Sequence, residues 1–178
     1  AASALAVAAS VLLPGANAAP ALAQSCAASA GSPVIEAASW GQQRMGAERA
    51  WPQTTGEVVV AVLDTGVSAA TASLQGVVLP GTDLAGGTGD VDCFGRGTFV
   101  ASLIAGRAVD GTEFVGMAPG ATILPVRLTS DPESLFLSTD LPGLLARGIT
   151  AAVEGGARVI AMPLTAASRD RQSTRLNS

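Results

Sequence analysis

Three short runs of apolar, largely β-branched residues lie along the chain, at 57–64, 121–128 and 158–162. Uninterrupted runs of this length are typical of strands that are buried on both faces of a parallel sheet. Pro125 lacks the backbone N–H that a ladder of hydrogen bonds needs, so it weakens the second strand or directs it toward a bulge. The pattern predicts three strands of one buried sheet.

Segments of helical character separate these runs. Residues 99–106 predict a buried helix that ends at Gly106, a longer helix is predicted at about 141–156, and the segment 40–51 has room for a short one. The stretch 68–95 is rich in Gly, Ser, Thr and Asp, which predicts surface loop with room for one short strand. Strands that alternate with helices predict an α/β layered domain, with a mostly parallel sheet flanked by helices.

The two ends of the chain differ in composition from its middle. Residues 1–23 are uncharged and apolar and contain Ala-x-Ala sites, which predicts a secretory signal peptide whose basic start is missing. A flexible Ala-rich extension and an apolar core helix are the alternatives. Residues 24–56 are predicted to form an N-terminal extension and 57–168 a partial α/β domain. Residues 169–178 are an atypical polar tail, either natural or foreign to the gene.

Composition narrows the function classes. The chain is 48% hydrophobic and 13% charged, which suits a packed core. Its formal net charge of −4, with scattered arginines, gives no electrostatic footprint for nucleic acid. These residues include no His, Lys or Tyr, so they supply no imidazole or lysine base and no imidazole metal ligand. We expect neither a cofactor nor a metal ion.

Asp64 is the first candidate for chemistry. It ends an apolar run and precedes Thr65 and Gly66, so it lies at the carboxyl end of a predicted strand, where open α/β sheets build their sites. A carboxylate there can orient and stabilise a catalytic base, although an Asp that caps the following turn is common. Asp-Thr-Gly is also similar to the aspartic-protease motif, which would need a second copy from a partner chain. A phosphatase-type nucleophile would want a second Asp where Gly66 stands.

A second set of motifs resolves this ambiguity. Residues 95–98 read Gly-Arg-Gly-Thr, 115–121 read Val-Gly-Met-Ala-Pro-Gly-Ala, and 157–164 read Ala-Arg-Val-Ile-Ala-Met-Pro-Leu. Together with Asp64 they resemble the subtilisin-like serine proteases, or subtilases, over roughly residues 40–165. The resemblance implies the N-terminal half of a subtilisin-like domain. Intact members of that family hydrolyse a peptide or protein substrate with a Ser–His–Asp triad.

Within that family the chain most resembles the mycosins, membrane-anchored proteases of type VII secretion systems. The resemblance is based on Ala-Trp-Pro at 50–52, on the approach to the second motif through Asp90 and Cys93, and on Cys26 after the apolar N-terminus. It implies a disulfide between Cys26 and Cys93. Such a bond could form if the chain is exported, because the environment outside the cytoplasm is oxidising. It also implies partnership with the type VII secretion machinery and a secreted or cell-envelope location.

The departures from the family bear on activity. Arg96 stands at the position of the family's histidine, and a guanidinium accepts no proton, so it cannot serve as a general base. It could instead form a bidentate pair with Asp64. Pro163 removes a backbone donor from the strand that lines the substrate in the family. The family's catalytic Ser segment, Gly-Thr-Ser-x-Ala-x-Pro, and its oxyanion-hole Asn do not occur in these residues.

These departures predict a subtilase homologue without peptidase activity. Two explanations stay open. In the first, the sequence is a damaged copy of an active protease. In the second, the protein is a true pseudoprotease that serves as a structural partner of the secretion machinery.

Overall fold

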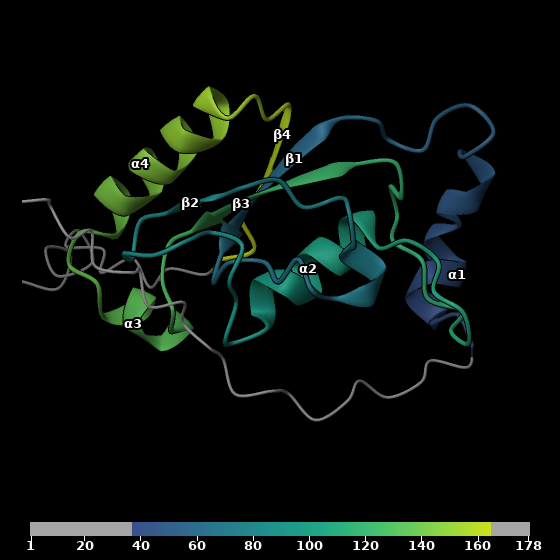
Figure 1. The fold of residues 1–178 in the computed structure, drawn as a ribbon, viewed down its shortest axis with the longest axis horizontal. Helices are drawn as coiled ribbons and strands as arrows, with labels where there is room; N and C mark the ends of the chain where they lie inside the picture. The colour runs from purple at the N-terminus through teal and green to yellow at the C-terminus, as the bar shows by residue number, and fades with distance from the viewer. Residues whose placement is uncertain (1–36, 165–178) are drawn as a thin grey trace, which may run out of the picture.

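A four-stranded parallel sheet forms the centre of the molecule (Figure 1). A computed structural model of the chain describes residues 37–164. Its strands are β1 Val59–Asp64, β2 Thr82–Asp83, β3 Thr122–Arg127 and β4 Val159–Ala161, and they lie in the order β2-β3-β1-β4. All the pairings are parallel. The three predicted strands and the short strand within the predicted loop are thereby confirmed.

Helices surround this sheet. They are α1 Trp40–Met45, α2 Arg96–Ala105, α3 Pro132–Leu137 and α4 Leu141–Glu154, with short 3₁₀ turns η1 Ala47–Arg49 and η2 Ala72–Leu74. The short helix expected within 40–51 is divided at Gly46, which adopts a left-handed φ of 57°. Helix α3 was not predicted, although its start has two recognisable signals. Asp131 caps the backbone N–H of Glu133, and Pro132 occupies the first turn.

Strand β1 is buried on both faces, as its unbroken apolar sequence predicts. Val60 and Val62 belong to a cluster that includes Ala101 of α2. Ala61 and Leu63 belong to a second cluster that includes Ala152 of α4. Since successive side chains of a strand point to opposite faces, α2 and α4 cover opposite sides of the sheet, as Figure 1 shows. The predicted α/β layered architecture is confirmed.

Helix α2 differs from the prediction in its burial. Its small residues, Gly97, Ala101 and Ala105, are buried against the sheet. Phe99 is 64% exposed and Leu103 is 40% exposed within the described residues, so the helix buries one face rather than its whole surface. The apolar sequence of 99–106 indicated a helix correctly but could not show how much of that helix the sheet covers.

Pro125 lies in the middle of β3 without interrupting it. It is in register with Val62 of β1 and is flanked by intact pairs on both sides. The backbone groups of Ile123 and Arg127 form hydrogen bonds with the segment 77–84, on the side of β3 away from β1. Because alternate residues of a strand point their backbone groups to the same side, the nitrogen of Pro125, which lacks a hydrogen, faces this segment as well. There, residues 78–82 lie opposite 123–126, one residue more than a regular ladder needs. The irregularity that proline predicts is therefore in the neighbouring segment.

The described residues were searched for membrane-spanning helices and for groups of potential metal ligands. Between residues 37 and 164, no helix has the length and apolar character needed to cross a bilayer. In the same part of the chain, no three acidic, cysteine or histidine side chains come together as potential metal ligands.

Candidate active site

The site begins where β1 ends. Asp64 is the last residue of the strand, and its side chain is completely buried. Its Oδ1 accepts the backbone N–H of Thr65 at 2.8 Å, while its Oδ2 has no hydrogen-bond partner. The sequence-based placement of Asp64 at the carboxyl edge of the sheet is confirmed, and one of its two oxygens faces the rest of the site.

Helix α2 begins directly against this strand end. Gly95 precedes the helix with a left-handed φ of 88°, which a residue with a side chain rarely adopts. At Gly97 a Cβ atom would overlap the carbonyl oxygen of Gly66 and press on the Cβ of Asp64. The glycine pair around Arg96 therefore lets the first turn of α2 touch the Asp-Thr-Gly turn, which places the Arg96 side chain beside Asp64.

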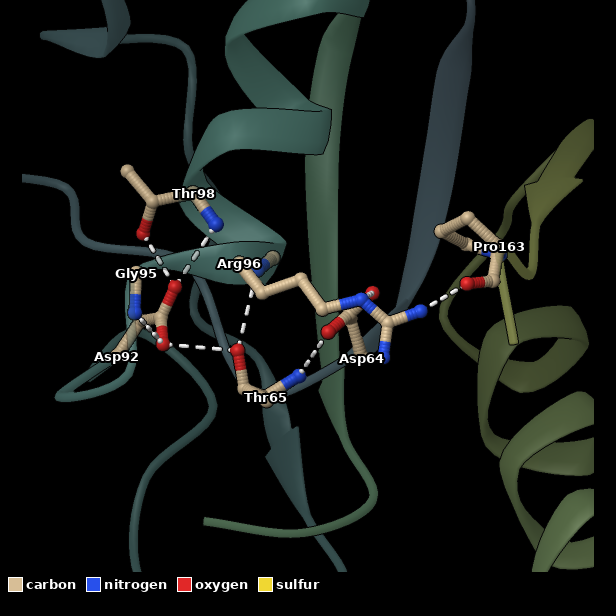
Figure 2. Close-up of polar contacts among 8 residues, drawn as sticks. Asp64, Thr65, Asp92, Gly95, Arg96, Thr98 and Pro163 are labelled. Carbon is tan, nitrogen blue, oxygen red and sulfur yellow. Dashed lines mark hydrogen bonds and ion pairs between the residues drawn. The ribbon is translucent and has the colours of Figure 1, made fainter. Parts of the chain in front are cut away.

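Asp92 joins these two motifs and was missed by the sequence analysis, which singled out Asp90. Its Oδ1 accepts the Thr65 hydroxyl and the Gly95 N–H, both at 2.8 Å. Its Oδ2 accepts the N–H and the hydroxyl of Thr98, at 2.8 and 2.6 Å (Figure 2). A carboxylate near the start of a helix is also favoured by the helix dipole. Its spacing of three residues before Gly95 was the available signal, since this spacing suits a carboxylate that caps α2 from outside the helix.

Arg96 approaches Asp64 from the first turn of α2. Its Nε lies 3.6 Å from Oδ2 of Asp64, which is an ion pair but too long for a hydrogen bond. Its Nη2 turns the other way and donates to the carbonyl oxygen of Pro163. The side chain is 30% exposed, whereas that of Asp64 is fully enclosed. The predicted bidentate pair is therefore wrong, because the guanidinium divides its donors between two partners.

The electrostatics of Asp64 follow from its enclosure. Burial raises the pKa of Asp64 above its ordinary value of 3.8, and the charge of Asp92 adds to the rise. The Thr65 N–H and the Arg96 charge act against this rise but do not outweigh it. A carboxylate in this position would orient an imidazole that lay between it and a nucleophile, and would stabilise the imidazolium that forms when the ring takes up a proton. Arg96 makes the charge contact but offers no lone pair for a proton.

A second Asp–Arg pair lies along the same sheet edge. Arg127 ends β3 in register with Asp64, and its Nη1 lies 3.2 Å from Oδ2 of Asp83, at the end of β2. Both side chains are buried. The carboxyl edge of the sheet therefore carries two arginine–carboxylate pairs, one between β1 and α2 and one between β2 and β3.

The predicted disulfide lies only partly within the described residues. Cys93 is exposed and follows Asp92 in the approach to α2. Cys26 lies outside the described residues, so the pairing of Cys26 with Cys93 stays a prediction.

The sequence was also compared with known families and proteins. A sequence model of the subtilase family matches residues 55–178, well over half of the chain. The chain belongs to the subtilase family. Mycosin-1 of Mycobacterium tuberculosis is 42% identical over 95 residues, which are 52% of this chain and 21% of that protein. Thermitase of Thermoactinomyces vulgaris is 32% identical over 138 residues, which are 74% of this chain and 46% of that protein.

Solved subtilase structures share the fold. MycP1 from the ESX-1 type VII secretion system superposes with a TM-score of 0.62 at 30% identity, over 73% of this chain and 37% of that chain. MycP3 from the ESX-3 system gives a TM-score of 0.62 at 33% identity, over 71% of this chain and 38% of that chain. The periplasmic assembly of the ESX-5 inner membrane complex contains a chain that gives 0.57 at 28% identity, over 72% of this chain and 39% of that one. The expected family and subtilisin-like fold are confirmed, and the subtilase chain spans less than half the length of these relatives.

Proposed function

We propose that this subtilase is mycosin-like and has no peptidase activity. The observation that carries the proposal is the position of Arg96, whose backbone starts α2 next to Asp64 and whose side chain contacts the carboxylate. This is the place from which a general base would act, and a guanidinium stays protonated throughout the working pH range. Removing the base removes the step that activates a serine hydroxyl.

Hydrolysis of an activated peptide ester tests this proposal. The purified chain is expected to give no turnover above buffer between pH 6 and pH 9, while thermitase in the same assay serves as the positive control. The Asp64→Asn variant separates a real activity from a contaminant. Turnover by the native chain that disappears in Asp64→Asn would contradict the proposal, whereas turnover that persists unchanged would indicate a contaminating protease.

A non-catalytic role at the cell envelope is the second part of the proposal. Its support is the similarity of the fold to chains of the ESX-1, ESX-3 and ESX-5 type VII secretion systems. Asp92 links the start of α2 to the residue that follows β1, so the site keeps its backbone arrangement with Arg96 at the position of the family's histidine. We infer that the protein serves as a structural partner of such a secretion machinery after export.

Affinity capture from cell-envelope membranes tests the structural role. The tagged chain should retain type VII membrane components under mild detergent, and the Asp64→Asn variant should retain them equally, because the role does not require chemistry. Capture that is no greater than with a tagged, unrelated exported protein would contradict the role. Non-reducing peptide mapping of the same preparation tests the disulfide proposed between Cys26 and Cys93.

A further inference from the structure

Arg96 connects two chain segments that the sheet itself leaves unconnected. The parallel pairing of β1 with β4 ends at the pair of Val62 with Ala161. Asp64 and Pro163 both lie beyond this last pair, at the end of one strand and after the end of the other. Arg96 contacts each of them, with Nε toward Asp64 and Nη2 donating to the Pro163 carbonyl (Figure 2).

The chemistry of the side chain suits this bridge. A guanidinium carries donors on separate nitrogens in a rigid planar fork, so one group can serve two acceptors that lie on different sides. A lysine ammonium is a single point charge rather than a planar fork. A histidine in contact with Asp64 has a shorter side chain than arginine, so it extends less far toward Pro163. Pro163 has no N–H, so its carbonyl is the one backbone polar group this residue offers. That group is already occupied by Arg96.

We infer that Arg96 acts as a strap that holds the site closed: it ties the segment after β4 to the end of β1 and occupies the Pro163 carbonyl. An extended peptide that added itself along this segment would need backbone acceptors for its own N–H groups. Arg96 uses one of the two lone pairs of the Pro163 carbonyl and its guanidinium lies against that oxygen, so a residue of the chain itself obstructs that pairing. The inference is based on the proposed function, since it requires Arg96 to have a structural rather than a proton-transfer role.

Selective isotope labelling makes the bridge directly observable. Pro163–Leu164 is the single Pro–Leu step in the sequence, so a chain labelled with ¹³C′-proline and ¹⁵N-leucine gives one carbonyl-correlated amide peak. Arg96→Ala in the full chain is expected to move this peak and to lower the heteronuclear NOE of the Leu164 amide. Arg96→Lys is expected to move it as well, because the three donors of an ammonium share one nitrogen, whereas Arg96 reaches its two partners from separate nitrogens.

Arg158→Ala is the matched control, since Arg158 is an exposed arginine just before β4. The inference is overturned if Arg96→Ala moves the Leu164 peak no further than Arg158→Ala does, or if Arg96→Lys leaves the peak in its native position. If Arg96→Ala does not fold, the native chain labelled with ¹⁵N-arginine supplies the test. A guanidinium with slow rotation and separate Nη signals should then be present in the native chain and absent in Arg96→Lys, in addition to any signal from the buried Arg127. If Arg96→Lys removes no slowly rotating guanidinium, the strap is overturned.

This experiment is independent of the proposed loss of activity. Ester hydrolysis by the native chain would overturn the proposed function while saying nothing of the Leu164 peak. An unmoved peak would overturn the strap while leaving the absence of a general base untouched.

Discussion

Two buried aspartates stand within one site and have opposite surroundings. Asp92 accepts four hydrogen bonds from Thr65, Gly95 and Thr98, two on each oxygen. Asp64 accepts one hydrogen bond on Oδ1, and its Oδ2 has only the distant Nε of Arg96. A fully satisfied carboxylate stabilises the structure around it, while a half-satisfied one pays the desolvation cost of its charge.

The two aspartates differ in role: Asp92 organises the backbone of the site, and Asp64 lies where proton-transfer chemistry would take place. Asp92 holds the first turn of α2 against the Asp-Thr-Gly turn, and this contact needs no catalytic partner. Asp64 has an open oxygen that an imidazole could use and that Arg96 meets only in part. The contacts that organise the backbone of the site are therefore complete among the described residues, whereas Arg96 lies where we propose that a general base would act.

Removing Asp92 should give the largest loss of stability. Asp92→Ala leaves the Thr65 hydroxyl and the N–H groups of Gly95 and Thr98 without their acceptor, and we expect the free energy of unfolding to fall by about 3–4 kcal/mol. Urea unfolding followed by circular dichroism measures this change. Asp90→Ala, at an exposed neighbour, should cost less than about 0.5 kcal/mol. Equal losses in the two variants would remove the structural role from Asp92.

The close approach of the two turns should be nearly as sensitive. Gly97→Ala places a methyl group against the Gly66 carbonyl and Asp64, and we expect a loss of about 2–3 kcal/mol from overpacking. Gly41→Ala is the matched control in α1, where the nearest atom to an added Cβ is the Ser39 hydroxyl at 3.8 Å. The control should be neutral or slightly stabilising. Thermal unfolding of both variants measures the difference, and a tolerated Gly97→Ala would contradict the contact.

Asp64 should respond to substitution in the opposite direction from Asp92. Its folded pKa is raised, so the native state binds the proton more tightly than the unfolded state, and stability is lost as pH rises from 3.8 through the folded pKa. Asp64→Asn should remove this dependence and leave stability at pH 7 within about 1 kcal/mol of the native chain or above it. Unfolding at several pH values between 3.5 and 7.5 measures the difference. A loss at pH 7 as large as that of Asp92→Ala would contradict the comparison.

Glu57 gives the smallest effect, because its carboxylate is exposed. The hydroxyls of Thr55 and Thr54 and nearby N–H groups lower the pKa of Glu57 to about 2. Its contribution is present above the unfolded pKa of 4.5 and is lost as pH falls toward 2. Glu57→Gln should lower the midpoint of thermal unfolding slightly at pH 7, and the effect should become smaller as pH falls toward 2. Glu113→Gln, at another exposed glutamate, should change neither midpoint.

The strands and the position of Asp64 could be predicted because they depend on local pattern. An unbroken β-branched run demands burial on both faces, and β1 meets this demand with α2 on one side and α4 on the other. The place of Asp64 at the strand end follows from the same pattern. The helix predicted over 99–106 is present, but it begins three residues earlier than predicted, at Arg96.

The rest depended on tertiary contacts. The spacing of Asp92 before Gly95 is a local signal for a helix cap, but its link to the Asp-Thr-Gly turn appears only when the fold brings Thr65 within reach. The contact of Arg96 with Pro163 joins residues far apart in the sequence, so charge complementarity alone suggested only the pair with Asp64. The exposed face of α2 likewise depends on what packs beside it rather than on its own apolar sequence.

The central claim is that Arg96, in an otherwise intact scaffold, is what removes the chemistry. A chimera tests it, in which residues 55–164 replace the matching segment of mycosin-1 of Mycolicibacterium smegmatis, a relative that is 34% identical over 137 residues. The measurement is kcat/KM for a peptide substrate, with Arg96 and with Arg96→His. We predict that the histidine chimera exceeds the arginine chimera by about 10²–10⁴-fold, the contribution of a positioned general base. Equal turnover by the two chimeras would contradict the account.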